Sequence, residues 1–394
     1  MASNGYIGVN STARLITNMY IGINGVARKI KKAYVGVNGI ARLWYEHRMR
    51  TIEFREYSGS GTKRYKLQGS ARAGNYAVFA GGETSRTSNS INKTTLVEAF
   101  SRTMTKVSAP SLRWEKDNGV GLTIGDNAFF AGGWNANGRT GDEVTMYTPS
   151  LTQSFADSLY TSGGSQLATK AGSYGIIAGG WRTLFLDSTY LSSAAAWNSS
   201  GTSQDIASLK SAAQCGSISA YVGGRGLMIR MDTNTTAEVY NAALTQSTFN
   251  AGVISNPGTY VASASNSNYA MIYSMGNGYT YLINPSLTIM SINTCIGSGD
   301  SGIIKNCAQA NYLAKPTQRT PNGSFIIYGM KNSSTPQYII LDGKKGTIIQ
   351  YSGFPSSNVA DSERECVGSV NFDDIVVMYN GYTGKPIFYK STDY

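Results

Sequence analysis

The sequence predicts an all-β chain in which a β-propeller of seven blades follows a small module of β-hairpins. Three observations predict this fold. Gly (45) and Tyr (26) are frequent among the 394 residues, and Ser, Thr and Asn fill long stretches, which is typical of short strands joined by turns. A hydrophobic stretch ending in glycine recurs about every fifty residues after position 68. A short phrase is written three times near the start.

The repeated phrase predicts three short hairpins. Its copies start at Tyr6, Tyr20 and Tyr34, and each reads Tyr-(Ile/Val)-Gly-(Val/Ile)-Asn ahead of an Ala-Arg pair. The second and third copies contain Asn-Gly, the strongest short hairpin signal, because a type I′ turn needs positive φ at two successive positions. A single hairpin is marginal in water. We therefore expect residues 1–49 to dock on another protein or on copies of themselves.

Positive charge is concentrated in the same part of the chain. The first 72 residues hold 13 of the 34 Lys and Arg residues but three of the 23 Asp and Glu residues, so the rest is close to neutral. A nucleic-acid partner is not expected, because no aromatic base-stacking pattern accompanies the charge. A solvated basic hairpin tip is one interpretation, and protein docking is the other. The candidate docking residues are Tyr20, Arg28, Lys29, Lys31, Lys32, Tyr34 and Arg42.

The phrase resembles the short Tyr-x-Gly-Val-Asn-Gly-x-Ala-Arg repeats near the start of bacteriophage tail and baseplate-associated structural proteins. The resemblance covers about residues 6–45 and implies attachment to a virion, without naming the part of the particle. Such proteins are commonly trimeric, so a homotrimer is a further expectation, although no coiled-coil heptads support it.

The body of the chain contains a longer repeat with two markers. The first is a hydrophobic stretch ending in glycine, and the second is a short strand that closes on an aromatic or large apolar residue. A four-stranded unit cannot cover both of its faces alone, so such units stack around an axis. The first marker occurs at 76–82, 127–133, 174–180, 219–224, 270–278, 324–330 and 374–381. The second occurs at 97–101, 144–148, 194–198, 237–241, 281–284, 339–342 and 387–390.

Small residues before the first marker suit an innermost strand, where room is least. Such segments are 69–74, 119–125 and 211–216. The strand-like stretch 50–58 is expected to complete the seventh blade, which removes the open edges of the ring. Residues 50–394 thus resemble kelch-like propellers, a resemblance that is specific for fold and almost silent on function. The Trp usual on a kelch outer strand is missing from most units.

Few residues suggest catalysis, so we expect no catalytic residues, no metal, no cofactor and no enzymatic activity. The sole histidine, His47, cannot build a multi-histidine metal site. The acids that a paired-carboxylate glycosidase would need fall in turn-like contexts. They are Asp142-Glu143, Glu363, Glu365 and Asp373-Asp374. The widely spaced Cys215, Cys295, Cys307 and Cys366 are interpreted as buried free thiols.

The loops after the glycine markers predict a ligand-binding face. Aromatic rings mixed with amide and guanidinium donors suit sugars, because rings stack on C–H surfaces and the donors bind hydroxyls or phosphates. The alternative is that Trp134 and Trp181 only pack between blades. The candidate glycan-binding residues are Trp134, Asn135, Arg139, Trp181, Arg182, Arg225, Tyr279 and Tyr382.

The leading hypothesis is a phage tail or baseplate protein, a receptor-binding protein that attaches to host-surface polysaccharide. Other virion proteins would be bound through residues 1–49, and weak single sites would be multiplied by many copies on one particle. The localisation expected is the virion, after assembly in the host cytoplasm. No secretory signal or membrane span is expected. The alternatives are a virion decoration or scaffold protein, a glycan-degrading tail enzyme, and a cellular kelch scaffold.

Overall fold

The computed structural model of the chain forms two compact units, Met1–Ile52 with Thr392–Tyr394, and Glu53–Ser391. It describes residues 6–9, 12–15, 20–23, 26–29, 32–37, 40–46, 50–64, 67, 69–86, 91–184, 187–212, 218–229, 236–252, 254, 261–274, 279–293, 306–313, 323–330, 336–344, 348–353, 368–381 and 383–393. His47, Cys215, Cys295, Glu363, Glu365 and Cys366 lie outside these residues.

The first unit contains three antiparallel hairpins. They are β1 (Tyr6–Val9) with β2 (Thr12–Leu15), β3 (Tyr20–Ile23) with β4 (Val26–Lys29), and β5 (Lys32–Val37) with β6 (Ile40–Glu46). Ile23 is paired with Val26 and Val37 with Ile40, which is the register that the predicted two-residue Asn-Gly turns require. The candidate docking residues Tyr20, Arg28, Lys29, Lys32, Tyr34 and Arg42 lie in these strands, and Lys31 lies outside the described residues.

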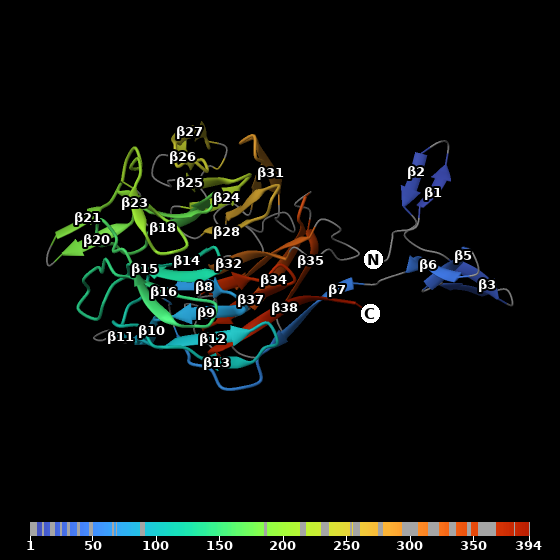
Figure 1. Cartoon of the computed structure of the whole chain (residues 1–394), viewed down its shortest axis with the longest axis horizontal. Coiled ribbons are helices and arrows are strands. Elements are labelled where there is room, and N and C mark those ends of the chain that lie inside the picture. Colours follow the sequence, from blue (N-terminus) through green and yellow to red (C-terminus); the bar gives the residue numbers. More distant parts are fainter. Residues whose placement is uncertain are drawn as a thin grey trace. The chain divides into compact units, whose positions relative to one another are not determined.

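The described part of the second unit contains seven four-stranded antiparallel sheets, joined successively along the chain (Figure 1). The first four are β8 (Gly69–Ala73), β9 (Tyr76–Ala80), β12 (Val97–Ser101), β13 (Lys106–Ser108); β14 (Val120–Ile124), β15 (Asn127–Ala131), β16 (Val144–Tyr147), β17 (Gln153–Ala156); β18 (Leu167–Ala171), β19 (Tyr174–Ala178), β22 (Ala194–Trp197), β23 (Ser203–Asp205); and β24 (Ile218–Val222), β25 (Arg225–Ile229), β26 (Thr236–Tyr240), β27 (Gln246–Asn250).

The last three sheets follow the same order, and the final one takes its outer strand from upstream. They are β28 (Val261–Ser265), β29 (Ala270–Ser274), β30 (Tyr279–Ile283), β31 (Ile289–Asn293); β32 (Asn306–Leu313), β33 (Ser324–Met330), β34 (Pro336–Asp342), β35 (Ile348–Gly353); and β36 (Gly368–Asn371), β37 (Ile375–Asn380), β38 (Lys385–Asp393), β7 (Arg50–Glu56). Two extra hairpins, β10 (Glu83–Arg86) with β11 (Ile91–Lys93) and β20 (Trp181–Leu184) with β21 (Asp187–Tyr190), interrupt the first and third sheets.

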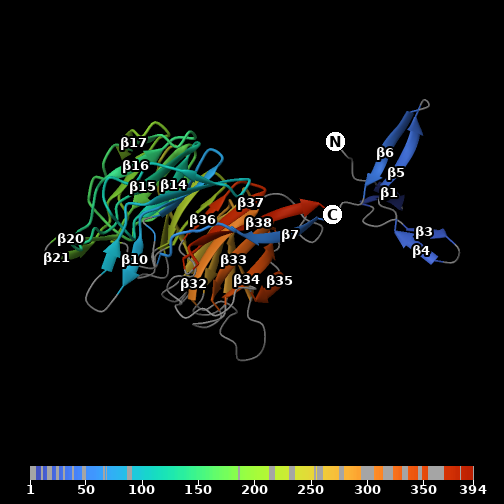
Figure 2. The same cartoon turned by 90° about the horizontal axis from the view of Figure 1, so that it is seen from below.

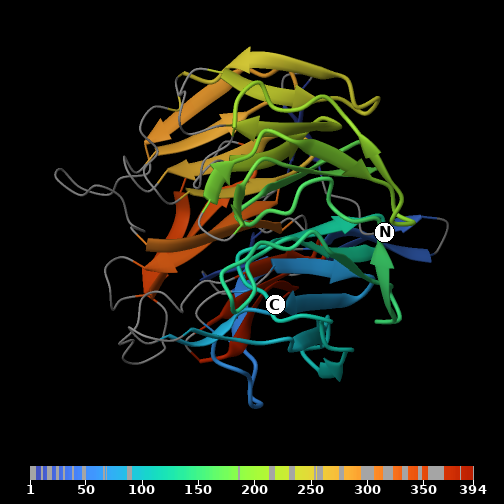
Figure 3. The same ribbon diagram turned by 90° about the vertical axis from the view of Figure 1, so that its left-hand side faces the viewer.

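The innermost strands form a closed ring. In the order β8, β14, β18, β24, β28, β32 and β36, each contacts the next, and β36 contacts β8 (Figure 3). Strand β7 lies beside β38 at the outer edge (Figure 2), and beyond it the Tyr57 amide donates to the Pro386 carbonyl over 2.9 Å. The architecture is therefore all-β and a β-propeller. Among the described residues, no helix is long and apolar enough to cross a membrane.

The hydrophobic core lies between successive sheets. The third strands are buried on both faces because each sheet is covered on both sides. Aromatic residues of the second marker are fully or almost fully buried, and three of them also bond to the segment that leaves the preceding sheet. Tyr147 Oη donates to Pro110 O (2.9 Å), Trp197 Nε1 to Asp157 O (3.0 Å) and Tyr240 Oη to Ala207 O (2.7 Å). The second marker therefore joins neighbouring sheets.

Three of the Gly-Gly markers end a second strand, as predicted, and the fourth does not. Gly81-Gly82, Gly132-Gly133 and Gly179-Gly180 all have positive φ and lead the chain out of the sheet. Gly223-Gly224 instead form the turn between the innermost strand β24 and the second strand β25. The prediction that 211–216 is an innermost strand is also wrong, because that strand is Ile218–Val222 and residues 213–217 lie outside the described part. A turn at positive φ favours glycine in either place, which explains the misassignment.

Candidate functional site

Trp134 and Trp181 lie together, in the loops that follow two neighbouring second strands. Their ring centroids are 6.0 Å apart at 85°, and the Trp181 ring also lies 5.9 Å from that of Tyr190. Trp134 exchanges backbone hydrogen bonds with Asp117 (2.9 and 3.1 Å), and its ring packs on Gly164. Both tryptophans are half-buried. They pack between sheets and leave only part of their surface for a ligand.

Of the polar candidates near them, Asn135 holds the loop together. Asn135 Oδ1 accepts hydrogen bonds from the Asn137 amide (3.0 Å) and the Arg139 amide (3.1 Å). The side chain of Arg139 is exposed. Arg182 is half-buried in β20, where it is paired with Thr189.

The structure describes two of the remaining three candidates, Arg225 and Tyr279. Arg225 begins the second strand β25 at the opposite end of its sheet, so its assignment to the loop face is wrong. The misplaced glycine marker caused this error. Tyr279 begins β30 and stacks on Tyr281, with centroids 6.2 Å apart at 28°. Tyr382 lies outside the described residues.

A groove beside Asn135 contains aromatic residues that the sequence analysis missed. Trp114 is 56% exposed and Phe155 is 53% exposed. The Arg113 guanidinium lies 5.4 Å from the Trp114 ring and 5.9 Å from the Phe155 ring. The volume of the groove is about 690 Å³. Its other lining residues are Glu115, Lys116, Asn135, Ala136, Asn137, Gly141, Asp142, Glu143, Val144, Ala156 and Ser158. Aromatic faces, amides and carboxylates in one groove suit a sugar.

Charged groups lie at the base of this groove. Lys116 is buried, and its Nζ lies 3.9 Å from Glu143 Oε1. Burial lowers the pKa of Lys116, while the charges of Glu143 and Asp142 oppose that shift. The Asp142-Glu143 pair noted in the sequence therefore lines the groove.

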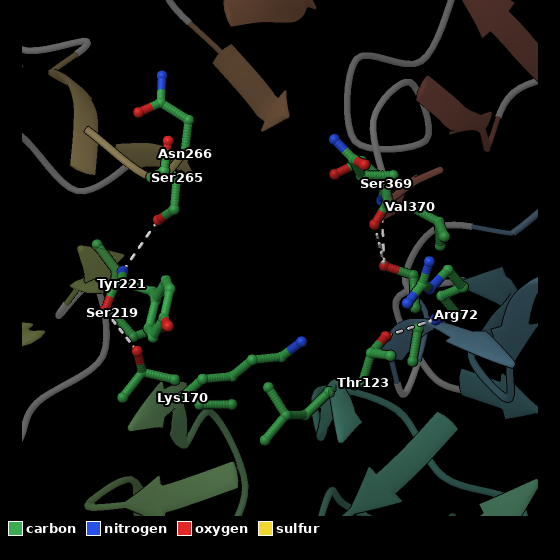
Figure 4. A pocket seen from close by; sticks show the side chains of 18 of the residues that line it. Arg72, Thr123, Lys170, Ser219, Tyr221, Ser265, Asn266, Ser369 and Val370 are labelled. Atoms are coloured by element: carbon green, nitrogen blue, oxygen red, sulfur yellow. Dashed lines mark hydrogen bonds between the residues drawn. The ribbon is translucent and has the colours of Figure 1, made fainter. Parts of the chain in front are cut away.

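A second hollow, of about 910 Å³, occupies the centre of the ring (Figure 4). Side chains alternate along each innermost strand, so every second residue faces the hollow. In six of the sheets one such residue lies at an equivalent position, the last or next to last of the innermost strand. These residues are Arg72, Thr123, Lys170, Tyr221, Ser265 and Asn371.

Hydroxyl groups of the innermost strands form hydrogen bonds to the neighbouring sheets. Thr123 Oγ1 accepts from the Arg72 amide (2.8 Å), and Ser265 Oγ accepts from the Tyr221 amide (2.9 Å). Thr169 Oγ1 also donates to the Ala220 carbonyl, and Ser70 Oγ lies 3.1 Å from both the carbonyl and the amide of Ser369. The wall of the hollow is therefore polar and tied together by hydrogen bonds. Among the described residues, no group of three or more His, Cys, Asp or Glu side chains is placed to hold a metal ion.

The fold is similar to that of solved lyases. A streptogramin B lyase structure has a TM-score of 0.55 at 9% identity, with 86% of this chain and 98% of that chain covered. A selenomethionine-substituted virginiamycin B lyase from Staphylococcus aureus (TM-score 0.54) and a catalytically inactive variant with quinupristin (0.53) are each 8% identical, covering 86% of this chain and 99% of those chains. No protein-family model and no curated protein matches the chain.

This comparison contradicts the prediction that the chain has no enzymatic activity, because the structures that it resembles are those of enzymes. The carboxylates and hydroxyls that line the groove and the central hollow therefore remain candidates for a chemical role. At 8–9% identity the likeness shows the fold alone and assigns no reaction to this chain.

Proposed function

We propose that the chain is a structural protein of a phage tail or baseplate that binds a glycan of the host surface. Residues 1–49 attach it to other virion proteins, and the seven sheets act as the blades of one propeller. The opening repeats support the virion assignment through their resemblance to phage tail proteins. The groove between Arg113, Trp114 and Phe155 is the observation that supports glycan binding.

The groove suits a sugar for a physical reason. More than half of the Trp114 and Phe155 surfaces is exposed, although burying an aromatic ring is favourable. The Arg113 guanidinium lies within 6 Å of both ring centroids, so its donors stand beside the two rings. A sugar ring stacked on Trp114 would meet the amides of Asn135 and Asn137 at the rim.

The first experiment is gold labelling of intact particles from the producing culture with an antibody against residues 69–394. Label at the distal tail is the expected result. Label on the head or along the shaft would instead support a decoration protein that binds only virion proteins. Label on no particle, with the protein found only in cell lysate, would overturn the virion assignment.

The second experiment tests the groove. Purified full-length chain is bound to host cells and to extracted host polysaccharide, and Trp114→Ala is compared with Tyr160→Ala. Tyr160 is 79% exposed and does not line the groove, so it is a matched control. We expect Trp114→Ala to weaken binding by about 1–3 kcal/mol, as loss of a stacking ring does, and Tyr160→Ala to leave it unchanged. Equal binding by both variants would exclude the groove.

Glycan cleavage is a second candidate, favoured by the presence of Asp142 and Glu143 in the same groove as Trp114. Two carboxyl groups are the minimum for glycoside hydrolysis. New reducing ends released from host polysaccharide by the natural chain, and lost in Asp142→Asn or Glu143→Gln, would establish cleavage. Binding without release of reducing ends would exclude it for that polysaccharide.

A further inference from the structure

Lys170 lines the central hollow and has no acidic partner among the residues that the structure describes. Its side chain extends from β18 into the space between Tyr221 and Thr123 (Figure 4). Neither an ion pair nor a hydrogen bond joins its Nζ to any residue of the described part. Burial lowers the pKa of Lys170, and the positive charge of Arg72 lowers it further, with Asp126 opposing.

Two other cations of the described residues have side chains that are buried and paired with acids. Arg64 is 2.8 Å from Glu98, and Lys93 is 2.5 Å from Asp117. Desolvating an unpaired charge is costly, so buried charges are normally paired. Lys170 is half-buried and lines a hollow that is open to a ligand, and it has no such partner among the described residues.

The second cation of the hollow, Arg72, is also poorly neutralised. Its guanidinium is 3.3 Å from Asp126, whose side chain is 70% exposed, so the pair is weak. Asp373 is the acid that lines the hollow, and it is exposed too. The potential between Lys170 and Arg72 is therefore positive.

Neutral donors complete the site. Thr123 Oγ1 and Ser265 Oγ each accept a bond from a backbone amide, so each keeps its own O–H to donate. Tyr221 and Asn371, which carry a hydroxyl group and a side-chain amide, line the hollow at the equivalent position of their strands. Two cations with hydroxyl and amide donors match an oxyanion attached to a molecule rich in hydroxyl groups.

We propose that the central hollow binds a phosphate ester of a sugar or polyol, with the phosphate between Lys170 and Arg72 and the hydroxyl groups against the polar wall. This site is separate from the Trp114 groove, and the donors assigned to it come from the innermost strands.

Calorimetric titration of the full chain with sn-glycerol 3-phosphate and glucose 6-phosphate tests this proposal. Glycerol, glucose and inorganic phosphate serve as comparison probes. We expect both esters to bind, the uncharged parents to show no heat of binding, and inorganic phosphate to bind more weakly than the esters. Lys170→Gln should weaken ester binding roughly tenfold to a hundredfold, as loss of one charge-assisted hydrogen bond does.

The control variant is Lys210→Gln, because Lys210 is exposed and outside the hollow, and it should bind the esters as the natural chain does. Thermal unfolding gives an independent readout, since the same ester concentration should raise the midpoint of the natural chain more than that of Lys170→Gln. Absence of binding at millimolar ester, or equal binding by Lys170→Gln, would overturn the proposal. Trp114→Ala should keep ester binding, so failure at either site is distinguished from failure at the other.

Discussion

Arg64 Nη2 lies 2.8 Å from Glu98 Oε2, and both side chains are fully buried. Arg64 belongs to the segment that follows β7, whereas Glu98 lies in the third strand of the first sheet. Tyr379 of the last sheet places its Oη 2.6 Å from the same Glu98 oxygen, and Lys106 Nζ is 2.5 Å from Oε1. One carboxylate thus joins the first sheet, the last sheet and the segment between them.

Replacing Arg64 should destabilise the propeller strongly. Arg64→Ala leaves Glu98 buried with only the half-exposed Lys106 as a cationic partner, and breaking a buried pair costs about 3–5 kcal/mol. Urea unfolding followed by tryptophan fluorescence measures the change. The matched control is Arg55→Ala, because Arg55 pairs with Glu53 at the surface and its side chain is 66% exposed. We expect that change to cost about 0–1 kcal/mol. Equal losses in the two variants would contradict the role given to the Arg64–Glu98 pair.

Tyr240 should make the stability of the fold fall at high pH. Burial raises the pKa of Tyr240 to about 12, with Gln246 lowering it and Glu238 raising it. The folded chain therefore keeps the phenol proton between about pH 10 and pH 12, where the unfolded chain loses it. This contribution is complete below pH ~10 and is lost as the pH rises through ~12.

The variant Tyr240→Phe isolates this effect. It loses the bond to Ala207 O, so it should be about 1 kcal/mol less stable than the natural chain at pH 8. The difference should shrink as the pH rises from about 10 to 12, because the variant has no phenol to ionise. Urea midpoints at pH 8, 10 and 11.5 measure it. A difference that stays constant over this range would refute the assignment.

Gly133 should resist substitution more than Gly138 in the same loop. Both have positive φ, +97° and +71°. A Cβ on Gly133 would lie 2.5 Å from the Asp117 carbonyl oxygen, whereas a Cβ on Gly138 would meet nothing within 4 Å. Gly138→Ala then costs about 1 kcal/mol of backbone strain alone, and Gly133→Ala costs more because a backbone must shift. Thermal midpoints of the two variants test the order, and the reverse order would contradict it.

Substitution of Trp134 and of Trp114 should distinguish a ring that stabilises the fold from a ring that binds a ligand. Trp134→Ala removes a half-buried ring that packs on Trp181 and Gly164, so we expect a loss of roughly 2 kcal/mol in unfolding free energy, less than a fully buried ring costs. Trp114→Ala removes an exposed ring and should leave the unfolding midpoint within the error of the measurement. If Trp114→Ala unfolded as easily as Trp134→Ala, the Trp114 ring would be structural.

The repeat was readable in the sequence because packing imposes it. Tyr147, Trp197 and Tyr240 recur in phase because each fills the space between two sheets and reaches a carbonyl of the preceding one. Gly223-Gly224 misled the assignment because glycine marks positive φ wherever the chain turns. Glycine alone does not say which two strands it joins.

The site residues were harder to predict, for two physical reasons. Trp114 and Phe155 are exposed, so no burial period marks them, and they come together because the segment before β14 lies beside the outer strand β17, where Gln153 donates to Ser111 O. Lys170 and Arg72 are nearly a hundred positions apart, and only closure of the ring places them in one hollow. Whether two residues on different sheets of a ring lie close together depends on the number and curvature of the sheets. A local sequence pattern does not contain that information.

Closure of the last sheet by β7 has a consequence for synthesis of the chain on the ribosome. Tyr379 Oη reaches the carbonyl of Thr62, a residue made 317 positions earlier. At about 5–20 residues per second, roughly 15 to 60 s separate the synthesis of these two partners. During that delay the β7 strand emerges with its edge unpaired and open to other chains. A chain released early would lack β38 and keep that edge, so truncated products should be the first to aggregate or be degraded in the producing cell.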